Sequence, residues 1–214
     1  MNVMTIIMIF SLKSMLIISL LFLETNSVIA EAETPRILPP ARLIEALQGG
    51  NHIIYMRHGL TIEEDVRPDR ALIDLTRCET QRNLSDAGEA QVQQLGIAIK
   101  ALNIPIGTVK ASPYCRTKDS ARHVFGEFEV DEDLGFSLAM PGEESERLGQ
   151  YLLDSMLASD DIEKNTVYVG HTSNLKDGLN VWPKPEGVMA IFKKEGNEII
   201  FKGLIKPDDW PKIE

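Results

Sequence analysis

The fold of this chain is decided by the stretch Ile53-Ile54-Tyr55-Met56-Arg57-His58-Gly59-Leu60-Thr61. Its first four residues are β-branched or apolar and predict a buried strand, which Gly59 ends at once. In an α/β sheet, ligands bind at the carboxyl ends of the strands, and here that position holds Arg57 and His58. Arginine presents a fixed fork of donors to phosphate oxygens, and neutral imidazole is a nucleophile. The stretch therefore predicts a site that binds and attacks a phosphoryl group.

Two further stretches have the same design. Residues 108–111 and 166–169 are predicted strands, and each is followed by polar residues, Ser112 to Thr117 in one case and Gly170 to Asn174 in the other. Helix-length segments separate the strands, so the strands are expected to be parallel and to end at one edge of the sheet. The side chains expected to gather at that edge are Arg57, His58, Arg116 and His171.

The chain resembles the histidine phosphatase superfamily, which includes the phosphoglycerate mutases. The matching pieces occur in family order and cover nearly the whole chain after residue 50. They are Arg57-His58-Gly59 with Thr61, Asn83-Leu84-Ser85-Asp86-Ala87-Gly88, Ser112-Pro113 with Arg116-Thr117, and Gly170-His171. The chain is most similar to small secreted bacterial members, through the segments Cys78 to Ser85 and Ser112 to Arg116.

The expected fold is α/β, a three-layer sandwich with a mostly parallel central sheet flanked by helices. Helices are predicted for residues 41–47, after the cap residue Ser85, and for 117–125 and 144–157, with a weaker indication for 175–179. Residues 188–192 and 199–202 predict an antiparallel C-terminal hairpin around Gly196-Asn197, whose outer strand completes the sheet.

The N-terminus is expected to be a secretory signal peptide. In residues 1–30, Lys13 divides two apolar runs that are each too short to span a bilayer, and Ala30 ends a plausible cleavage site. An uncleaved anchor is the alternative, while the lack of a cysteine after the run argues against a lipid anchor. Residues 31–40 are expected to be a flexible lead-in and 41–214 the phosphatase-like domain. We expect a periplasmic or secreted protein with no stable membrane anchor after cleavage.

Composition limits the partners. The net charge of −10 argues against nucleic acid as a partner. It also means that any phosphate site must be a local positive pocket in an acidic protein. The expected partner is a small phosphorylated substrate. The sequence has no glycine-rich phosphate loop with its lysine, no carboxylate cluster and no closely spaced histidines. We therefore expect no metal and no cofactor. The oligomeric state is left open.

The residues and the resemblance together predict a secreted phosphomonoesterase. His58 is expected to attack phosphorus and form a phosphohistidine, with the phosphate held by Arg57 and Arg116. His171 is expected to donate to a phosphoryl oxygen, and Thr61 and Asn83 are weaker candidates for phosphate binding. The resemblance to secreted relatives suggests cell-envelope phosphates as substrates. A non-catalytic phosphate- or polyanion-binding protein is the alternative, although binding alone does not require two histidines. A glycolytic mutase conflicts with the signal peptide and the short length.

The polar insert after Thr61, residues 62–82, carries several arginines. Arg67, Arg70, Arg77 and Arg82 can all pair with acidic residues of the same insert, but Arg82 lies in the family-like segment and is a candidate substrate contact.

The two cysteines of the chain, Cys78 and Cys115, are expected to form a disulfide, because an even pair in a secreted chain is normally bridged. Two unrelated buried thiols are the alternative.

The proton donor is missing from its usual places. The resemblance implies an acid directly after the second histidine, where Thr172 stands, or shortly after Leu134, where Gly135 and Phe136 follow. The remaining candidates are Asp131, Glu132, Asp133, Glu143 and Glu144, each of which can equally be surface charge. Glu144 is the preferred one, and aryl phosphates and phosphoramidates are expected to turn over faster than alkyl phosphates.

Overall fold

The computed structural model describes residues 37–62 and 73–213, all of which belong to one compact unit that spans Thr34–Glu214. The expected signal peptide, part of the lead-in, and Arg67 and Arg70 of the insert lie outside the described residues and stay predictions.

Five α-helices and six strands make up the described fold, with four short 3₁₀ helices between them or after them. The helices are α1 (Pro40–Gln48), α2 (Asp86–Ala101), α3 (Cys115–Phe125), α4 (Gly142–Leu157) and α5 (Thr172–Leu179). The strands are β1 (Ile53–Arg57), β2 (Ile106–Ala111), β3 (Glu129–Val130), β4 (Asn165–Gly170), β5 (Met189–Glu195) and β6 (Glu198–Ile205). They form one sheet in the order β3-β2-β4-β1-β5-β6.

The sheet is mixed as predicted. Strand β4 pairs in parallel with both β1 and β2, so the three strands that carry the site motifs are direct neighbours. Strands β5 and β6 form the antiparallel hairpin, and β5 joins the sheet antiparallel to β1. The prediction of an outer hairpin strand at the edge of the sheet is confirmed.

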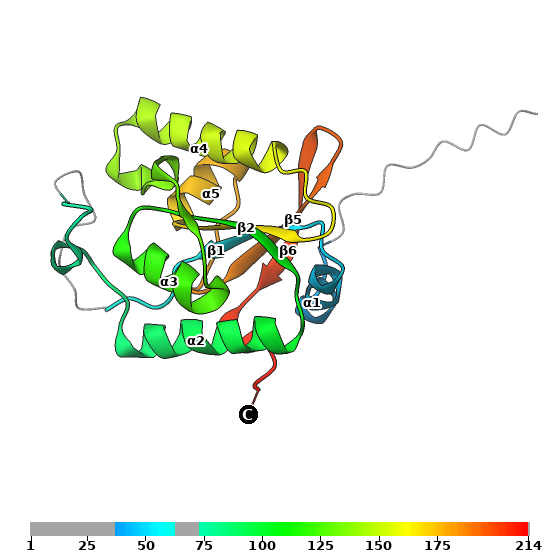
Figure 1. Cartoon of the computed structure of the whole chain (residues 1–214). Helices are drawn as coiled ribbons and strands as arrows, with labels where there is room; N and C mark the ends of the chain where they lie inside the picture. The colour runs from blue at the N-terminus through cyan, green and yellow to red at the C-terminus, as the bar shows by residue number, and fades with distance from the viewer. Residues whose placement is uncertain (1–36, 63–72, 214) are drawn as a thin grey trace, which may run out of the picture. The chain divides into compact units, whose positions relative to one another are not determined.

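Helices cover both faces of the sheet (Figure 1). Helices α2 and α3 pack against one face, together with α1, through a core that includes Leu43, Val92 and Val124. Helices α4 and α5 cover the other face, where Leu152 and Leu175 pack on Tyr168 of β4. The three-layer α/β sandwich is confirmed.

Local chemistry explains the packing of α2 beneath the site. Ser85 caps this helix by accepting a hydrogen bond from the backbone N–H of Gly88 at 3.0 Å, and Asp86 and Glu89 lie in its positively polarised first turn. A Cβ at Gly88 would overlap the carbonyl of Leu60, and one at Gly59 would overlap Val92. The two glycines therefore let α2 approach the loop that follows β1.

The structure differs from the sequence predictions in two places. Residues 129–130, for which no strand is predicted, pair with β2 as the short strand β3. The described end of the expected lead-in is ordered by backbone contacts, since Leu38 donates its N–H to the Lys202 carbonyl at 2.7 Å and Pro40 begins α1.

Candidate active site

A cavity of about 370 Å³ opens at the carboxyl ends of β1 and β4. It is within the range of roughly 300–1,000 Å³ typical of pockets for small organic ligands. Both predicted arginines and both predicted histidines line it. The full set is Arg57, His58, Arg82, Arg116, Phe136, Leu138, Ser145, His171, Thr172, Ser173, Lys176, Asp177, Trp182 and Lys184.

Strand pairing brings the two histidines together. Arg57 is in register with Gly170, and the backbone N–H of His58 donates to the Gly170 carbonyl at 3.1 Å. The ring centroids of His58 and His171 are consequently 5.6 Å apart. The parallel arrangement predicted from sequence is what places residues 113 positions apart at one site.

His58 is held with one ring nitrogen available. Its Nδ1 lies 2.9 Å from the carbonyl oxygen of Gly59, which can only accept, so Nδ1 carries the proton and Nε2 has the free lone pair. Burial, then the positive charge of Arg116, lowers the pKa of His58 well below its usual value. The ring is therefore neutral at neutral pH, which is the nucleophilic form.

His171 is fixed through its backbone and its ring. Its N–H donates to the hydroxyl of Tyr55 at 2.9 Å, and that hydroxyl donates to the His171 carbonyl at 2.7 Å. Its Nε2 lies 2.9 Å from Ser112 Oγ, and its Nδ1 lies 3.2 Å from a guanidinium nitrogen of Arg116. Because a guanidinium only donates, Nδ1 is an acceptor and Nε2–H is directed at Ser112.

The surroundings keep His171 uncharged in the free site. Burial, followed by the charge of Arg116, lowers its pKa well below the usual value. A bound phosphate dianion is negatively charged, in contrast to Arg116, and would therefore favour protonation of the His171 ring.

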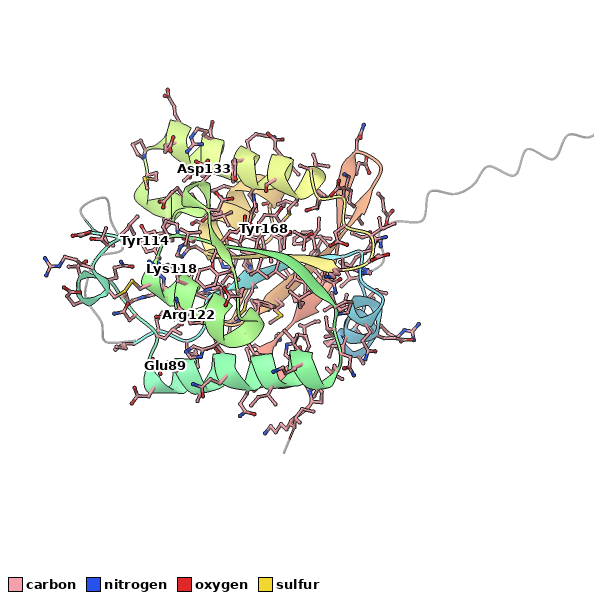
Figure 2. All side chains as sticks on the ribbon, in the orientation of Figure 1. Glu89, Tyr114, Lys118, Arg122, Asp133 and Tyr168 are labelled. Carbon is pink, nitrogen blue, oxygen red and sulfur yellow. A yellow bond between two sulfur atoms is a disulfide. The ribbon has the colours of Figure 1, made fainter. Side chains whose placement is uncertain are left out.

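Arg116 is the most deeply buried cation of the site, with 1% of its surface exposed. Its guanidinium lies 4.7 Å from the ring centroid of Tyr114, which stands at the start of α3 (Figure 2). Phe136 lies on the same guanidinium at 5.8 Å. Aromatic faces attract a guanidinium and restrict its motion, so Arg116 is presented to the cavity in a fixed position.

Arg57 is held by a carboxylate that the sequence analysis did not find. Its Nη2 donates to Glu186 Oε1 at 2.9 Å, and both side chains are less than one-fifth exposed. Burial lowers the pKa of Arg57, and the charge of Glu186 acts in the opposite direction. Arg57 Nε is buried without a hydrogen-bond partner among the described residues, so it remains as a donor for a ligand.

Glu186 also accepts hydrogen bonds from two other predicted site residues, Thr61 and Arg82. It accepts from the backbone N–H of Thr61 at 2.9 Å, from the Thr61 hydroxyl at 3.2 Å, and from Arg82 Nη2 at 3.4 Å. Thr61, a predicted phosphate ligand, does not line the cavity and instead supports Glu186. Arg82 does line the cavity, and its contact with substrate stays a prediction.

Besides Thr61, two predicted residues do not line the cavity. Asn83 uses its amide to donate to the Cys78 carbonyl at 2.8 Å. Glu144 is bonded to Arg147 at 2.7 Å, an ion pair that lowers its pKa, and its neighbour Ser145 faces the cavity instead. The structure therefore gives no support to Glu144 as the proton donor, and of the other four candidate acids none lines the cavity.

Several cavity residues went undetected in the sequence. Thr172 has a buried hydroxyl with no partner in the described structure, which makes it a second donor available to a ligand. Asp177 is the one carboxylate among the described lining residues, and it accepts from Ser137 at 2.8 Å and Ser145 at 2.9 Å. Trp182, which also lines the cavity, and Glu186, which lies behind Arg57, were missed for another reason: they fall in a turn-rich segment that has no periodicity.

The predicted disulfide is present between Cys78 and Cys115, with their Cα atoms 5.7 Å apart. It joins the described end of the insert to the first residue of α3, the helix that carries Arg116. Next to it, buried Gln81 accepts from the Cys115 N–H at 2.9 Å. The disulfide therefore links the segment that precedes Arg82 to the helix that carries Arg116.

Within residues 37–62 and 73–213, no group of three or more histidine, cysteine or acidic side chains is placed to hold a metal ion. No helix of the same residues has the length and apolarity needed to cross a bilayer.

Comparisons with known proteins identify the fold. No family model and no curated protein sequence matches the chain. Among solved structures, phosphoserine phosphatase from Entamoeba histolytica bound to 3-phosphoglyceric acid matches with a TM-score of 0.55 and 16% identity, covering 72% of this chain and 96% of that chain. The chain has the histidine phosphatase fold.

Two more structures agree with this histidine phosphatase fold. A variant of the Entamoeba enzyme bound to phosphoserine matches with a TM-score of 0.54 and 16% identity over 74% of this chain and 98% of that one. A candidate alpha-ribazole-5′-phosphate phosphatase from Escherichia coli K-12 matches at 0.58 and 13% identity over 77% of this chain and 100% of that one. At such identities the likeness establishes the fold, and the chemistry must be argued from the site.

Proposed function

We propose that this protein is a secreted phosphomonoesterase that works through a phosphohistidine on His58, without a metal or cofactor. The observation that carries the proposal is the state of His58. Its Nδ1–H is bonded to the Gly59 carbonyl and its ring is kept neutral by burial beside Arg116, so Nε2 is a free nucleophile inside a cationic cavity.

In the first step, the Nε2 lone pair of His58 attacks phosphorus in line with the leaving oxygen. The bond between phosphorus and that oxygen breaks, and the electron pair leaves with the alkoxide or phenoxide, which takes a proton from water. The guanidinium groups of Arg57 and Arg116 stabilise the equatorial oxygens by charge-assisted hydrogen bonds. Arg57 Nε and the Thr172 hydroxyl, both buried without partners in the described structure, are donors suited to this anion.

In the second step, water attacks the phosphohistidine. The phosphorus–nitrogen bond breaks, and its electron pair returns to Nε2. One proton of the attacking water stays on orthophosphate, and the other passes to solvent, where it neutralises the hydroxide left by the first step. His58 is thereby regenerated in its original tautomer, since the Gly59 carbonyl still holds Nδ1–H.

His171 is proposed to act as a donor only when substrate is bound. In the free site its Nδ1 accepts from Arg116. A bound dianion would favour the imidazolium and would accept the hydrogen bond that Arg116 donates to Nδ1 in the free site, so that Nδ1–H is left to donate to a phosphoryl oxygen. The charge on this ring would follow the charge of the ligand.

A phosphate-binding protein without turnover is the competing function. Binding would use the arginines, but it does not explain a second buried histidine 5.6 Å from the first, nor a free Nε2 on His58. We therefore favour the enzyme.

Secretion is supported by the disulfide, because such bonds persist in oxidising compartments. The apolar residues at the N-terminus agree with it. A cell-envelope phosphate remains our candidate for the physiological substrate.

Measuring phosphate release from phenyl phosphate by the purified mature protein tests the proposal. His58→Asn is expected to abolish release, whereas His123→Asn, which changes an exposed histidine on α3, is expected to leave it intact. Equal activity of the His58 variant and the wild type would overturn the proposal. Retained phosphate binding without turnover in the wild type would favour the binding protein.

A further inference from the structure

A second group of side chains lines the cavity besides the arginines and the histidines. Lys176, Lys184 and the side chain of Trp182 line it together with Leu138. We propose that the leaving group of the substrate carries a second anionic group, a carboxylate or a phosphate, on a ring or other flat apolar body. This inference rests on the proposed function and specifies the substrate class of the same site.

Charge is the first argument. Five cationic side chains line the cavity, against Asp177 as the one carboxylate among the described lining residues. Counted over the described residues alone, and with Glu186 included behind Arg57 and Arg82, the positive charges exceed the negative ones by more than the two charges of a phosphate monoester. The whole chain carries a net charge of −10, so this local excess is not a consequence of composition.

Lys184 is the lysine best placed to meet a second anion. Its ammonium lies 5.3 Å from the ring centroid of Trp182, and no carboxylate pairs with it in the described part of the chain. Lys176 differs, since it lies 3.5 Å from Asp177. The serine hydroxyls of Ser137 and Ser145 occupy the other oxygen of that carboxylate, so Asp177 supports the wall of the cavity.

The apolar component comes from exposed side chains. Trp182 is 51% exposed and Leu138 is 76% exposed, although both belong to the cavity wall. Large apolar side chains left open to solvent at a cavity commonly mark a ligand surface. An indole beside an ammonium suits a flat ring that bears an anion, because the ring stacks and the anion meets the cation.

Matched aryl phosphates test the inference. The probes are phenyl phosphate, meta-carboxyphenyl phosphate, meta-(aminomethyl)phenyl phosphate and meta-phenylene bisphosphate, and kcat/KM is measured for each. The wild type is expected to prefer the carboxylate over the unsubstituted probe by about three- to tenfold, in line with one or two exposed ion pairs. The aminomethyl probe is expected to be the poorest, and added salt should reduce the differences. The bisphosphate and carboxylate probes distinguish the two kinds of second anion.

The variants isolate the lysine. Lys184→Met is expected to bring the carboxyphenyl-to-phenyl ratio close to one, and Lys184→Glu to invert it. Lys164→Met is the control, since Lys164 directly precedes the amino end of β4, whereas the cavity lies at its carboxyl end, and Lys164 does not line the cavity. Dividing one probe by another within each variant cancels any general loss of activity in that variant, and comparing this ratio between variants cancels the intrinsic reactivity of the leaving groups.

The outcomes separate the two proposals. If phenyl phosphate is not hydrolysed by the wild type, the proposed function fails. If it is hydrolysed but the carboxylate ratio is one, or is unchanged in Lys184→Met, the inference about the second anion is overturned while the phosphatase stands.

Discussion

Glu186 receives a 2.9 Å hydrogen bond from Arg57, the residue that precedes the candidate nucleophile. The two lie 129 positions apart in sequence, and their contact depends on the segment before β5 docking on the end of β1. That docking is visible in the backbone, where Gly187 donates its N–H to the His58 carbonyl at 2.8 Å. Glu186 is thus a positioning residue for Arg57 and, through a longer contact, for Arg82.

Removing this carboxylate is expected to impair catalysis without unfolding the protein. Glu186→Gln should lower kcat/KM for phenyl phosphate by about 10- to 100-fold, because small displacements of an orienting arginine are costly. Since Arg57, which is proposed to bind the phosphate group, would be held less firmly, the inhibition constant of orthophosphate should rise as well. Glu146→Gln, which changes an exposed glutamate on α4, is the control. Unchanged kinetics in Glu186→Gln would show that Arg57 needs no such support.

The buried histidines are expected to make stability depend on pH. Burial lowers the folded-state pKa of His58 and of His171, so below about pH 6.5 the unfolded chain binds more protons than the folded one, and stability decreases as the pH is lowered. His52, whose pKa is also lowered by burial, acts in the same direction. His58→Asn should reduce the slope of the unfolding free energy against pH by up to about 1.4 kcal/mol per pH unit.

Chemical denaturation at a series of pH values between neutrality and mild acid measures this slope. His123→Asn, which replaces an exposed histidine, serves as the reference and should keep the wild-type slope. An identical slope in His58→Asn would mean that His58 is not held neutral.

The disulfide is expected to contribute substantially to stability. Cys78 and Cys115 close a loop with a sequence separation of 37, for which the chain-entropy model gives roughly 3–4 kcal/mol. The double variant Cys78→Ser with Cys115→Ser should lose about this much unfolding free energy and become insensitive to reductant. Denaturation with and without reductant provides the measurement, and two free thiols titrated in the native secreted protein would contradict the bridge.

The leaving group is expected to control the rate. Asp177 is the single carboxylate among the described lining residues and already accepts two serine hydroxyls, so no free acid in that set protonates the leaving oxygen. Aryl phosphates and phosphoramidates should therefore turn over much faster than alkyl phosphates, by about the 10²–10⁴-fold that a general acid typically supplies.

Glu144 supplies the decisive variant. It is paired with Arg147 away from the cavity wall, so Glu144→Gln should leave alkyl phosphate turnover unchanged. A hundredfold loss confined to alkyl phosphates would identify Glu144 as the acid after all, and a wild type without leaving-group dependence would remove the premise.

Sequence reasoning predicted the elements whose signals are local. Strands β1, β2 and β4 follow from short apolar runs that end in glycine or polar residues, and parallel pairing then brings Arg57, Arg116 and the two histidines to one cavity. The cap residue Ser85 marked the start of α2 in the same way.

What sequence reasoning missed depends on contacts between distant segments. Glu186 follows Pro185 in a segment without periodicity, and nothing local shows that β5 aligns Met189 with Met56 and so delivers the glutamate to Arg57. Thr61 and Asn83 were predicted from the motif as phosphate ligands, but the motif could not show that Glu186 and the Cys78 carbonyl are their partners. Strand β3 is two residues long and carries no alternating pattern.

The most direct test of the account is to trap the intermediate on His58. Wild-type protein is mixed with a radiolabelled aryl phosphate, quenched in alkali within the first turnover, and digested for peptide mapping. We expect label on the peptide that contains His58, stable in alkali and lost in acid, and no label on His58→Asn. Label on another residue, or rapid phosphate release with no labelled protein at any quench time, would contradict the phosphohistidine mechanism.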